Sequence, residues 1–432
     1  MRPETQVIEA DFTWIDGRFQ ACARVEVDAG GVIRAVRVGG AGATRRLTQR
    51  ALLPGFVNVH SHAFQRALRG RGEAFPQGQG DFWTWRLAMY ELVESLDADE
   101  FARLCRLAFT EMLAAGITTV GEFHYLHHDA PSADNCVFDE LVLEAAADVG
   151  IRLVLLLCFY RTGGIGKPLL GGQRHFESTS VDAFLRQLDR LQSKLDARTQ
   201  TMGIAPHSIR AVPTSDLLAL RRAAAERGLV FHMHVEEQRR EIEECRGALG
   251  VTPLGWMLDH LPIDDKCTIV HATHSERDEI ARYVAAGGRV CVCPITEGNL
   301  GDGVAAHMPE TLKTPDAVCI GSDSNIRIDF AEELRWLEFV HRLREERRGV
   351  FADPPEGVVG RRLLRIGTRA GAAALGLNTG AIEAGRPADF FTVDLTHPTL
   401  VGWTPETLLD AYLFGGGREA VREVCVAGRW VR

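Results

Sequence analysis

The sequence predicts an α/β fold, a (β/α)8 TIM-like barrel joined to a small β-sandwich domain that is built from the N- and C-terminal segments. The prediction rests on eight apolar strand-like runs, on the amphipathic helical stretches that separate most of them, and on their extent of roughly 270 residues, which suits one barrel. The runs lie at 52–60, 117–123, 152–159, 201–206, 229–235, 267–272, 289–293 and 317–322. A doubly wound open sheet is the competing prediction, but it would not place functional side chains at nearly every strand's C-terminal end.

The intervening segments have the signature of helices. The stretches "DEFARLCRLAFTEMLAAG", "FDELVLEAAADVG" and "TSDLLALRRAAAERG" each end at a glycine, the residue that most often terminates a helix. Both ends of the chain read as β structure instead: "ARVEVDAGGVIRAVRV" predicts a hairpin around Gly30 and Gly31, and "ADFFTVDL" and "REVCVAGRWVR" follow near the C-terminus. Because chain termini commonly lie close together, we expect these segments to pair into one small sheet. The predicted division is 1–53 and 385–432 for this domain and 54–384 for the barrel.

Composition narrows the class of protein. The chain of 432 residues carries a net charge of −9 without a Lys/Arg-rich run, which argues against nucleic-acid and anionic-membrane partners. No apolar run approaches the ~18 residues of a membrane span, and the first residues lack a signal-peptide pattern. The ten cysteines include no C-x-x-C pair, and five of them lie in apolar strand-like runs, where Cys behaves as a small buried hydrophobe. These five are Cys158, Cys267, Cys291, Cys293 and Cys319. The sequence predicts a cytoplasmic protein.

Metal-binding residue types gather at the predicted strand ends. His60 and His62 share one face of the first strand because side chains alternate along a strand. An H-x-H pair alone is equally compatible with ordinary polar residues at the barrel rim. His234 at the end of strand five and Asp323 at the end of strand eight complete three imidazoles and one carboxylate, a donor set typical of zinc or iron. His271 ends strand six, so polar groups occupy four different strand ends.

The motifs "PGFVNVHSH", "HMHVEEQ", "VHATH" and "GSDSN", in this order, resemble the amidohydrolase superfamily across almost the whole chain. The resemblance implies that one divalent ion is bound by His60, His62, His234 and Asp323. Binuclear members add a lysine on strand four, which "TMGIAPHSIR" lacks, so we expect a mononuclear site. Zinc is the expected ion, with Fe²⁺ as the alternative. A histidine cluster after strand two is interpreted as rim residues rather than as a second metal site: His124, His127 and His128.

The deaminase branch of this superfamily carries a glutamate three residues after the strand-five histidine, and Glu237 fits that position. A solvated carboxylate at a helix start is the alternative interpretation, since Glu236 and Glu241 are its neighbours. In the expected mechanism, metal-activated water attacks the carbon of a C=N group, and His271 and Asp323 hydrogen-bond the nucleophile. Glu237 passes a proton to the departing nitrogen, and ammonia leaves.

Two further stretches, "NVHSHAFQRALRG" with "DFWTWRLAMYELV" and "VCPITEGNLGDG", resemble the formimidoylglutamate deiminase family. That resemblance implies hydrolysis of N-formimidoyl-L-glutamate to N-formyl-L-glutamate and ammonia, a step of histidine degradation. It also implies that the glutamyl portion is bound by Gln65, Arg86, Tyr125, His207 and Arg210. Arginine suits a dianionic substrate because it binds carboxylates bidentately. Arg86 has an alternative role, capping Asp81 or stacking on Trp83 or Trp85.

Two other functions remain open from the sequence. The chain could be a mononuclear deaminase or chlorohydrolase for a guanine- or triazine-like heterocycle, although the two arginines favour a small acyclic dicarboxylate. It could also be a catalytically silent barrel that serves as a scaffold, because fold alone does not imply function. The expected partners are the small-molecule dicarboxylate substrate and, by analogy with relatives, a second copy in a homodimer. The Trp-rich 80–90 segment is a candidate for a loop that closes over the site.

Overall fold

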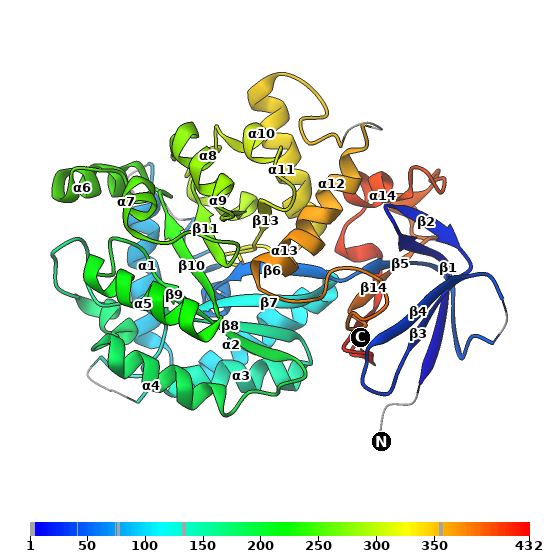
Figure 1. Cartoon of the computed structure of the whole chain (residues 1–432), viewed down its shortest axis with the longest axis horizontal. Coiled ribbons are helices and arrows are strands. Elements are labelled where there is room, and N and C mark those ends of the chain that lie inside the picture. The colour runs from blue at the N-terminus through cyan, green and yellow to red at the C-terminus, as the bar shows by residue number, and fades with distance from the viewer. Residues whose placement is uncertain (1–4, 41, 74, 76–77, 132–134, 354–356) are drawn as a thin grey trace.

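The structure is a computed structural model that describes residues 5–40, 42–73, 75, 78–131, 135–353 and 357–432. A barrel of parallel strands wrapped by helices forms the larger part, and a separate sheet lies beside it (Figure 1). The barrel strands follow one another in chain order around the sheet. Because neighbouring strands are parallel, each pair is joined by a crossover connection rather than by a hairpin. The predicted (β/α)8 fold is therefore confirmed.

The elements of the barrel agree closely with the predicted runs. The strands are β6 (Phe56–Ser61), β7 (Ile117–His124), β8 (Arg152–Phe159), β9 (Gln200–Pro206), β10 (Val230–Val235), β11 (Cys267–His271), β12 (Arg289–Val292) and β13 (Val318–Ile320). The helices between and after them are α1 (Phe82–Ser95), α2 (Ala98–Ala114), α3 (Val137–Val149), α4 (Val181–Gln192), α5 (Thr214–Arg227), α6 (Arg239–Leu249), α7 (Pro253–His260), α8 (Arg277–Ala285), α9 (Pro294–Leu300), α10 (Met308–Thr311), α11 (Phe330–Glu345), α12 (Val359–Arg365) and α13 (Gly371–Ala374).

Local chemistry explains the helix boundaries. Asp81 and Asp97 accept backbone N–H groups at the starts of α1 and α2, which satisfies donors that have no partner within the helix. Gly150 and Gly228 end α3 and α5 with φ of 82° and 66°, the left-handed conformation that glycine adopts without a steric penalty. Among the helices of the described residues, none is both long and apolar enough to cross a bilayer.

The first predicted run, 52–60, proves to be two strands in two different sheets. Its first residues end β5 (Arg45–Pro54), which belongs to the separate sheet, and β6 starts after Gly55. Continuous hydrophobicity concealed this break, because both strands are buried.

The separate sheet combines the two ends of the chain, as predicted. Its strands run in the order β16-β15-β14-β5-β1-β3-β4, with β2 paired to β1. Their bounds are β1 (Gln6–Ile15), β2 (Arg18–Ala21), β3 (Ala23–Val27), β4 (Ile33–Val38), β14 (Phe390–Asp394), β15 (Val421–Val426) and β16 (Arg429–Trp430). β3 and β4 form the hairpin expected around Gly30 and Gly31, and β5 pairs with β14 from the opposite end of the chain. The C-terminal end of the chain lies beside this sheet (Figure 1).

The barrel closes between its first and last strands through backbone and side-chain contacts at the rim. A parallel bridge joins Ser61 to Asp323, with His62 N donating to Asp323 O at 2.9 Å and Asp323 N donating to His60 O at 2.9 Å. Gly321 makes this approach possible, because a Cβ there would lie 2.7 Å from His60 O. The closure thus fixes the backbone of the H-x-H pair against that of the strand-eight aspartate.

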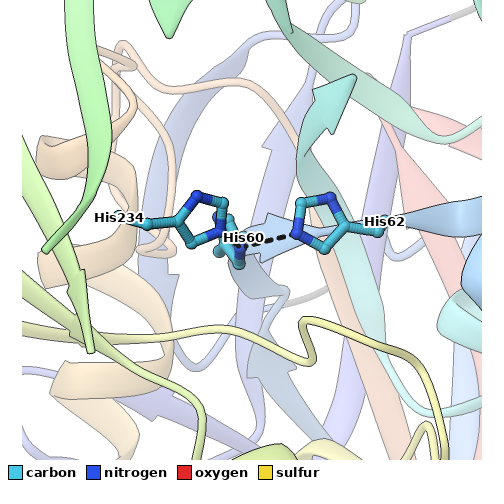
Figure 2. Close-up of side chains that lie close together, drawn as sticks. All are labelled: His60, His62 and His234. Carbon is cyan, nitrogen blue, oxygen red and sulfur yellow. Dashed lines mark hydrogen bonds between the residues drawn. The ribbon is translucent and has the colours of Figure 1, made fainter. Parts of the chain in front are cut away.

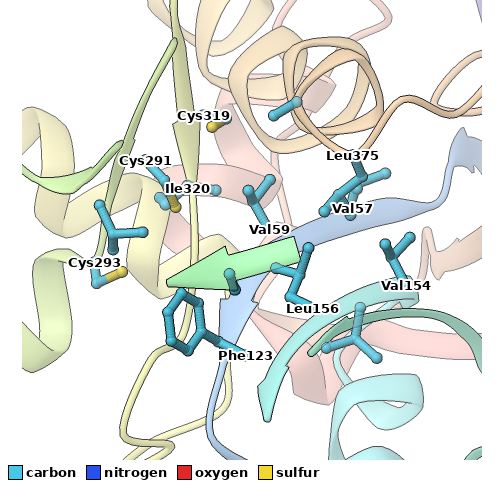
Figure 3. Packing of buried hydrophobic residues seen from close by; sticks show 14 of the residues in the cluster. Val57, Val59, Phe123, Val154, Leu156, Cys291, Cys293, Cys319, Ile320 and Leu375 are labelled. Carbon is cyan, nitrogen blue, oxygen red and sulfur yellow. The ribbon is translucent and has the colours of Figure 1, made fainter. Parts of the chain in front are cut away.

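The barrel core is built from alternating side chains of the strands and the inner faces of the helices. Val57, Val59, Phe123, Leu156 and Ile320 are all fully buried in it (Figure 3). The five cysteines assigned to strands are buried as well, and the ten cysteines form no disulfide among the described residues. A smaller core lies within the separate sheet, so each part has its own apolar packing.

Candidate metal and active site

Three imidazoles converge at the C-terminal end of the barrel strands. His60 Nε2 lies 3.1 Å from both His62 Nε2 and His234 Nε2, and Figure 2 shows the three rings meeting at their tips. Asp323 Oδ1 lies 3.3 Å from His62 Nε2 and 3.5 Å from His60 Nε2. All four side chains are at least nine-tenths buried. The structure therefore brings together the four residues predicted as metal ligands.

The three imidazoles and Asp323 have too few N–H protons to form hydrogen bonds with one another. His62 Nδ1 and His234 Nδ1 each contact a backbone carbonyl oxygen, of Phe123 at 2.8 Å and of His207 at 2.9 Å, so both Nδ1 atoms act as donors. Their Nε2 atoms then present lone pairs toward His60, which can donate to only one of them. Burial also lowers the pKa of His62 to about 3, which keeps its ring neutral. Converging lone pairs beside a carboxylate are the donor set that a divalent cation requires.

The spacing of these atoms supports the same conclusion. Ligand atoms at ~2.0–2.1 Å from a tetrahedral ion lie roughly 3.3 Å from one another. The distances from His60 to His62, His234 and Asp323, and from His62 to Asp323, range from 3.1 to 3.5 Å. The thiol of Cys293 also lies near Asp323 and His271. Burial raises the pKa of that thiol well above its usual value, so it remains protonated.

A second cluster of two histidines and an aspartate lies outside the site. His124 Nε2 and His127 Nδ1 contact Asp139 Oδ1 at 2.9 and 2.8 Å, and His127 Nε2 contacts Cys158 O at 2.8 Å. Gln187 Nε2 donates to the other oxygen of Asp139 at 2.8 Å. These are hydrogen-bond distances with a proton for each contact, so His127 is a buried imidazolium paired with a carboxylate. The cluster holds the β7–α3 connection, and the interpretation of these histidines as rim residues rather than a second metal site stays a prediction.

Glu237 and His271 lie on the open side of the metal group. His271 Nε2 is 3.8 Å from Glu237 Oε1 and 3.7 Å from Asp323 Oδ2. Burial raises the pKa of Glu237 to about 7, although His271 and Arg210 oppose the shift. Burial would lower the pKa of His271, but the surrounding carboxylates, with Glu237 the strongest, raise it to about 10. A carboxyl group with a pKa near neutrality can both accept and release a proton.

The backbone at the strand ends is strained where these groups project. His271 has a φ of 71° and Asp323 a φ of 45°, conformations that residues with a Cβ seldom adopt. Such strain persists only where the surrounding structure enforces it, and it clusters at functional sites. Here the barrel closure and the neighbouring strands supply that constraint.

The predicted substrate-binding residues all line one pocket with the metal group. The pocket encloses about 540 Å³ including its open mouth, and α1 contributes much of its wall. The predicted residues that line it are Gln65, Arg86, Tyr125, His207 and Arg210. Gln65 Nε2 donates to Tyr125 OH at 2.5 Å, and Arg86 Nη2 donates to Tyr160 OH at 3.2 Å. The pocket is thus polar at its rim and partly aromatic along its sides.

The two arginines differ in how far their charges are already engaged. Arg210 lies 3.8 Å from Glu237 and 3.5 Å from Glu241, both buried carboxylates. Arg86 has no carboxylate within ion-pair distance among the described residues, and Asp81 caps Thr84 instead. The indole of Trp83 does lie near Arg86, with 5.6 Å from the guanidinium carbon to the ring centroid, so stacking accompanies the exposure of Arg86 to the pocket.

Several residues of the site were not predicted from the sequence. Glu297 accepts the backbone N–H of Cys293 at 2.9 Å and lies 3.3 Å from His271 Nδ1, so it holds the imidazole from behind. Tyr90 and Tyr160 line the pocket. The motif "VCPITEGNLGDG" contained Glu297, but nothing in its spacing showed that the side chain turns back toward strand six. Tyr90 lies in the stretch "DFWTWRLAMYELV", but nothing in its spacing showed that the side chain faces the pocket, and Tyr160 lies outside the quoted motifs.

Comparison with known proteins identifies the family. Residues 51–431 match the amidohydrolase family. The chain belongs to the amidohydrolase family. A formimidoylglutamate deiminase from Pseudomonas aeruginosa is 38% identical over 94% of this chain and 90% of the relative. A 5-methylthioadenosine/S-adenosylhomocysteine deaminase from Natronomonas pharaonis is 28% identical over 87% of this chain and 80% of the relative.

Solved structures agree with this assignment. An amidohydrolase from Brucella melitensis has a TM-score of 0.89 and 32% identity, covering 98% of this chain and 94% of the other. An adenosine deaminase from Xanthomonas campestris, crystallised with bound zinc, has a TM-score of 0.81 at 23% identity, which shows the shared fold. The homology and the metal-binding groups together indicate an enzyme, a hydrolase acting on C–N bonds that depends on a divalent metal.

Proposed function

We propose that this enzyme hydrolyses N-formimidoyl-L-glutamate to N-formyl-L-glutamate and ammonia. The carrying observation is that one pocket joins the proton-deficient His/Asp group, the Glu237–His271 pair and Arg86, which has no carboxylate partner among the described residues. The homologue from Pseudomonas aeruginosa, described as formimidoylglutamate deiminase, supports the assignment. An acyclic dicarboxylate suits a pocket with one arginine beside Glu237 and a second beside Tyr160.

The metal ion would be held by His60, His62, His234 and Asp323. When bound, the ion lowers the pKa of a coordinated water and so supplies the nucleophile near neutral pH. The backbone carbonyls that receive the Nδ1 protons fix the tautomers of His62 and His234, which keeps their Nε2 lone pairs directed at the ion. Zinc is the ion we propose, because imidazole and carboxylate donors at tetrahedral spacing suit it; Fe²⁺ is the alternative.

Glu237 is proposed as the proton carrier of the reaction. Its raised pKa lets it accept the proton of the attacking water and then deliver that proton to the departing nitrogen. His271, held by Glu297 at Nδ1, directs Nε2 toward the same space and hydrogen-bonds the oxygen that attacks the C=N carbon. Asp323 contributes its second oxygen to this position, since Oδ2 faces His271.

The glutamyl portion of the substrate is assigned to the remaining polar groups of the pocket. Arg210, beside Glu237, would bind the carboxylate nearer to the reacting carbon, and His207 and Gln65 flank it. Burial and the neighbouring arginines lower the pKa of His207 well below its usual value, so this ring is neutral and can donate or accept a hydrogen bond. Tyr125 contributes its hydroxyl through its contact with Gln65.

A substrate comparison tests the proposal. Ammonia release is measured for the zinc-loaded enzyme with N-formimidoyl-L-glutamate, guanine and 5′-methylthioadenosine under the same conditions. We expect kcat/KM for the formimidoyl compound to exceed that for either heterocycle by at least about a thousand-fold, because a neutral ring leaves the Arg86 charge without a carboxylate partner in the pocket. Turnover of a heterocycle without turnover of the formimidoyl compound would replace the assignment by the alternative deaminase. If the purified protein contains no divalent ion and binds none on reconstitution, the scaffold alternative is favoured.

Three finer points complete the proposal. The domain boundaries are proposed at 53/54 and 384/385, close to the end of β5 and ahead of β14. A cytoplasmic location is proposed because the ten cysteines form no disulfide among the described residues, as in a reducing compartment. A homodimer is proposed by analogy with relatives, and sedimentation velocity of the holoenzyme would distinguish it from a monomer.

A further inference from the structure

Two tyrosine hydroxyls and one buried amide form a compact polar group on the pocket wall. Tyr90 lies on α1, Tyr160 follows β8, and Gln173 lies on the 3-10 helix η2 (Gly171–Phe176). Both tyrosines line the pocket, whereas Gln173 is buried behind them and only 5% exposed. Tyr90 lies in the stretch "DFWTWRLAMYELV" without an assigned role, and Tyr160 and Gln173 lie outside the quoted motifs.

The orientation of the Gln173 amide is fixed by its backbone contact. Its Oε1 accepts the N–H of Leu170 at 3.0 Å, so its Nε2 faces the tyrosines. Nε2 donates to Tyr90 OH at 3.0 Å and to Tyr160 OH at 3.1 Å, and a third contact, to Gly163 O, is longer at 3.4 Å. The tyrosine oxygens are therefore acceptors in their contacts with the amide.

Arg86 makes the Tyr160 hydroxyl oxygen accept a second time. Its Nη2 donates to Tyr160 OH at 3.2 Å, and its guanidinium carbon lies 5.3 Å from the centroid of the Tyr90 ring. A hydroxyl has two lone pairs and one proton. With both lone pairs of the Tyr160 oxygen used, its proton must point away from Arg86 and Gln173. The Tyr90 oxygen accepts from Gln173, so its proton also points away from the amide, and neither proton has a protein acceptor among the described residues. Burial raises the pKa of Tyr90, so this hydroxyl keeps its proton.

Two O–H groups without a protein acceptor among the described residues, beside a guanidinium, favour a ligand group that only accepts hydrogen bonds and carries negative charge. An ionised carboxylate meets both conditions. The centroid of the Tyr160 ring lies 4.7 Å from that of His207, and the His207 centroid lies 4.8 Å from that of His234. One imidazole ring therefore stands between the Tyr160 ring and His234. Arg210 lies closer to the reacting end, beside Glu237.

We propose that Tyr90 and Tyr160 donate hydrogen bonds to the distal carboxylate of the substrate, together with Arg86, and that Gln173 is the positioning residue that turns both hydroxyl protons into the pocket. This inference rests on the proposed function, which supplies a dicarboxylate. The proximal carboxylate goes to Arg210. Specificity for a dicarboxylate follows, because a ligand without the distal group leaves two buried hydroxyl protons and one guanidinium unpaired.

Binding of unreactive ligands tests the inference independently of turnover. Isothermal titration calorimetry of the zinc-loaded enzyme is performed with N-formyl-L-glutamate and with N-formyl-L-norvaline, which lacks the distal carboxylate. We expect Tyr90→Phe and Tyr160→Phe each to weaken N-formyl-L-glutamate binding about ten-fold or more, as for the loss of a hydrogen bond to a charged group. The affinity for N-formyl-L-norvaline should change by less than about two-fold.

Two further variants separate positioning from packing. Gln173→Glu keeps the size of the side chain but replaces the donating amide by an accepting carboxylate, which would draw both hydroxyl protons away from the pocket. We expect it to weaken N-formyl-L-glutamate binding at least as much as either Phe variant. Tyr412→Phe is the matched control, because Tyr412 OH is buried without a partner and does not line the pocket; its affinities should equal those of the wild type.

The outcomes separate this inference from the proposed reaction. Equal losses for both ligands, unchanged affinity in the Phe variants, or no preference of the wild type for N-formyl-L-glutamate would overturn the inference. Ammonia release from N-formimidoyl-L-glutamate by the wild type reports on the reaction. Turnover with insensitive Phe variants contradicts the inference alone, and variant-sensitive binding without turnover supports it while contradicting the reaction.

Discussion

Two clusters built from the same residue types behave in opposite ways in this barrel. The group of His60, His62, His234 and Asp323 has too few protons for its contacts, whose atoms lie 3.1–3.5 Å apart. In the other, Asp139 accepts hydrogen bonds from His124 and His127 at 2.9 and 2.8 Å. His62, His234 and His127 each donate from their second ring nitrogen to a backbone carbonyl oxygen, so the difference lies in the first nitrogen. That nitrogen faces the imidazole of His60 in the first cluster and a carboxylate in the second. Residue type alone therefore does not distinguish a metal centre from a buried ion pair, whereas a count of protons does.

The largest expected effect comes from removing one member of each cluster. His234→Ala should abolish stable metal binding and reduce kcat/KM by more than about a thousand-fold, since three donors and an incomplete sphere remain. The matched variant His124→Ala should keep a full complement of metal. Plasma emission spectrometry of the purified proteins with ammonia-release kinetics gives both readouts, and metal loss in His124→Ala would erase the distinction.

A variant that keeps the metal isolates the proton-transfer step. Glu237→Gln should retain one ion per chain and lose about 10²–10⁴-fold in kcat, because the amide cannot carry the proton while the ligands are intact. Steady-state kinetics and metal content of the same preparation check this. Wild-type turnover in the variant would remove Glu237 from the proton path.

The ion-pair cluster should contribute to stability rather than to catalysis. His127→Ala leaves the fully buried Asp139 with one imidazole fewer, and we expect a loss of about 3–5 kcal/mol in the free energy of unfolding. Activity per folded molecule should remain close to that of the wild type. Urea denaturation followed by circular dichroism measures the first quantity, and a loss of kcat without destabilisation would argue for a role of His127 in the reaction.

The two clusters should also respond to pH with opposite signs. Burial lowers the pKa of His62 to about 3, so in the metal-free protein its contribution to stability is present above the unfolded pKa of ~6.5 and is lost as pH falls, at up to about 1.4 kcal/mol per pH unit. Burial opposes a charged His127, but Asp139 outweighs it and raises its pKa. The contribution of His127 to stability is therefore present below pH ~6.5 and is lost as pH rises through its raised pKa.

Unfolding of the metal-free protein between pH 5 and 8 measures these slopes. In His62→Asn the free energy of unfolding should fall less steeply as pH is lowered. In His127→Ala it should fall less steeply as pH is raised. Identical profiles for the two variants would contradict the assignment of opposite protonation states.

Much of this arrangement could be predicted from the sequence because it depends on periodicity and on strand ends. Alternation along a strand placed His60 and His62 on one face, and the parallel barrel brought His234 and Asp323 to the same rim. The split of the run at 52–60 between two sheets could not be predicted, since Gly55 interrupts a stretch that is buried on both sides.

The unpredicted side chains of the site depend on loops and on rotamers. The Glu297 side chain accepts a backbone N–H of its own segment and also contacts His271. Tyr90, Tyr160 and Gln173 contact one another only because α1 and η2 pack against the end of β8. Such contacts follow from tertiary packing rather than from spacing along the chain. Sequence patterns therefore predicted the metal end of the pocket more completely than its substrate end.

The most direct test of the central claim is a zinc titration of the metal-free enzyme, with ammonia release from N-formimidoyl-L-glutamate as the readout. The single four-residue group predicts that activity rises in proportion to added zinc and reaches its plateau at one ion per chain. Full activity in the absence of a divalent ion, or a plateau reached only at two ions per chain, would contradict a mononuclear deiminase.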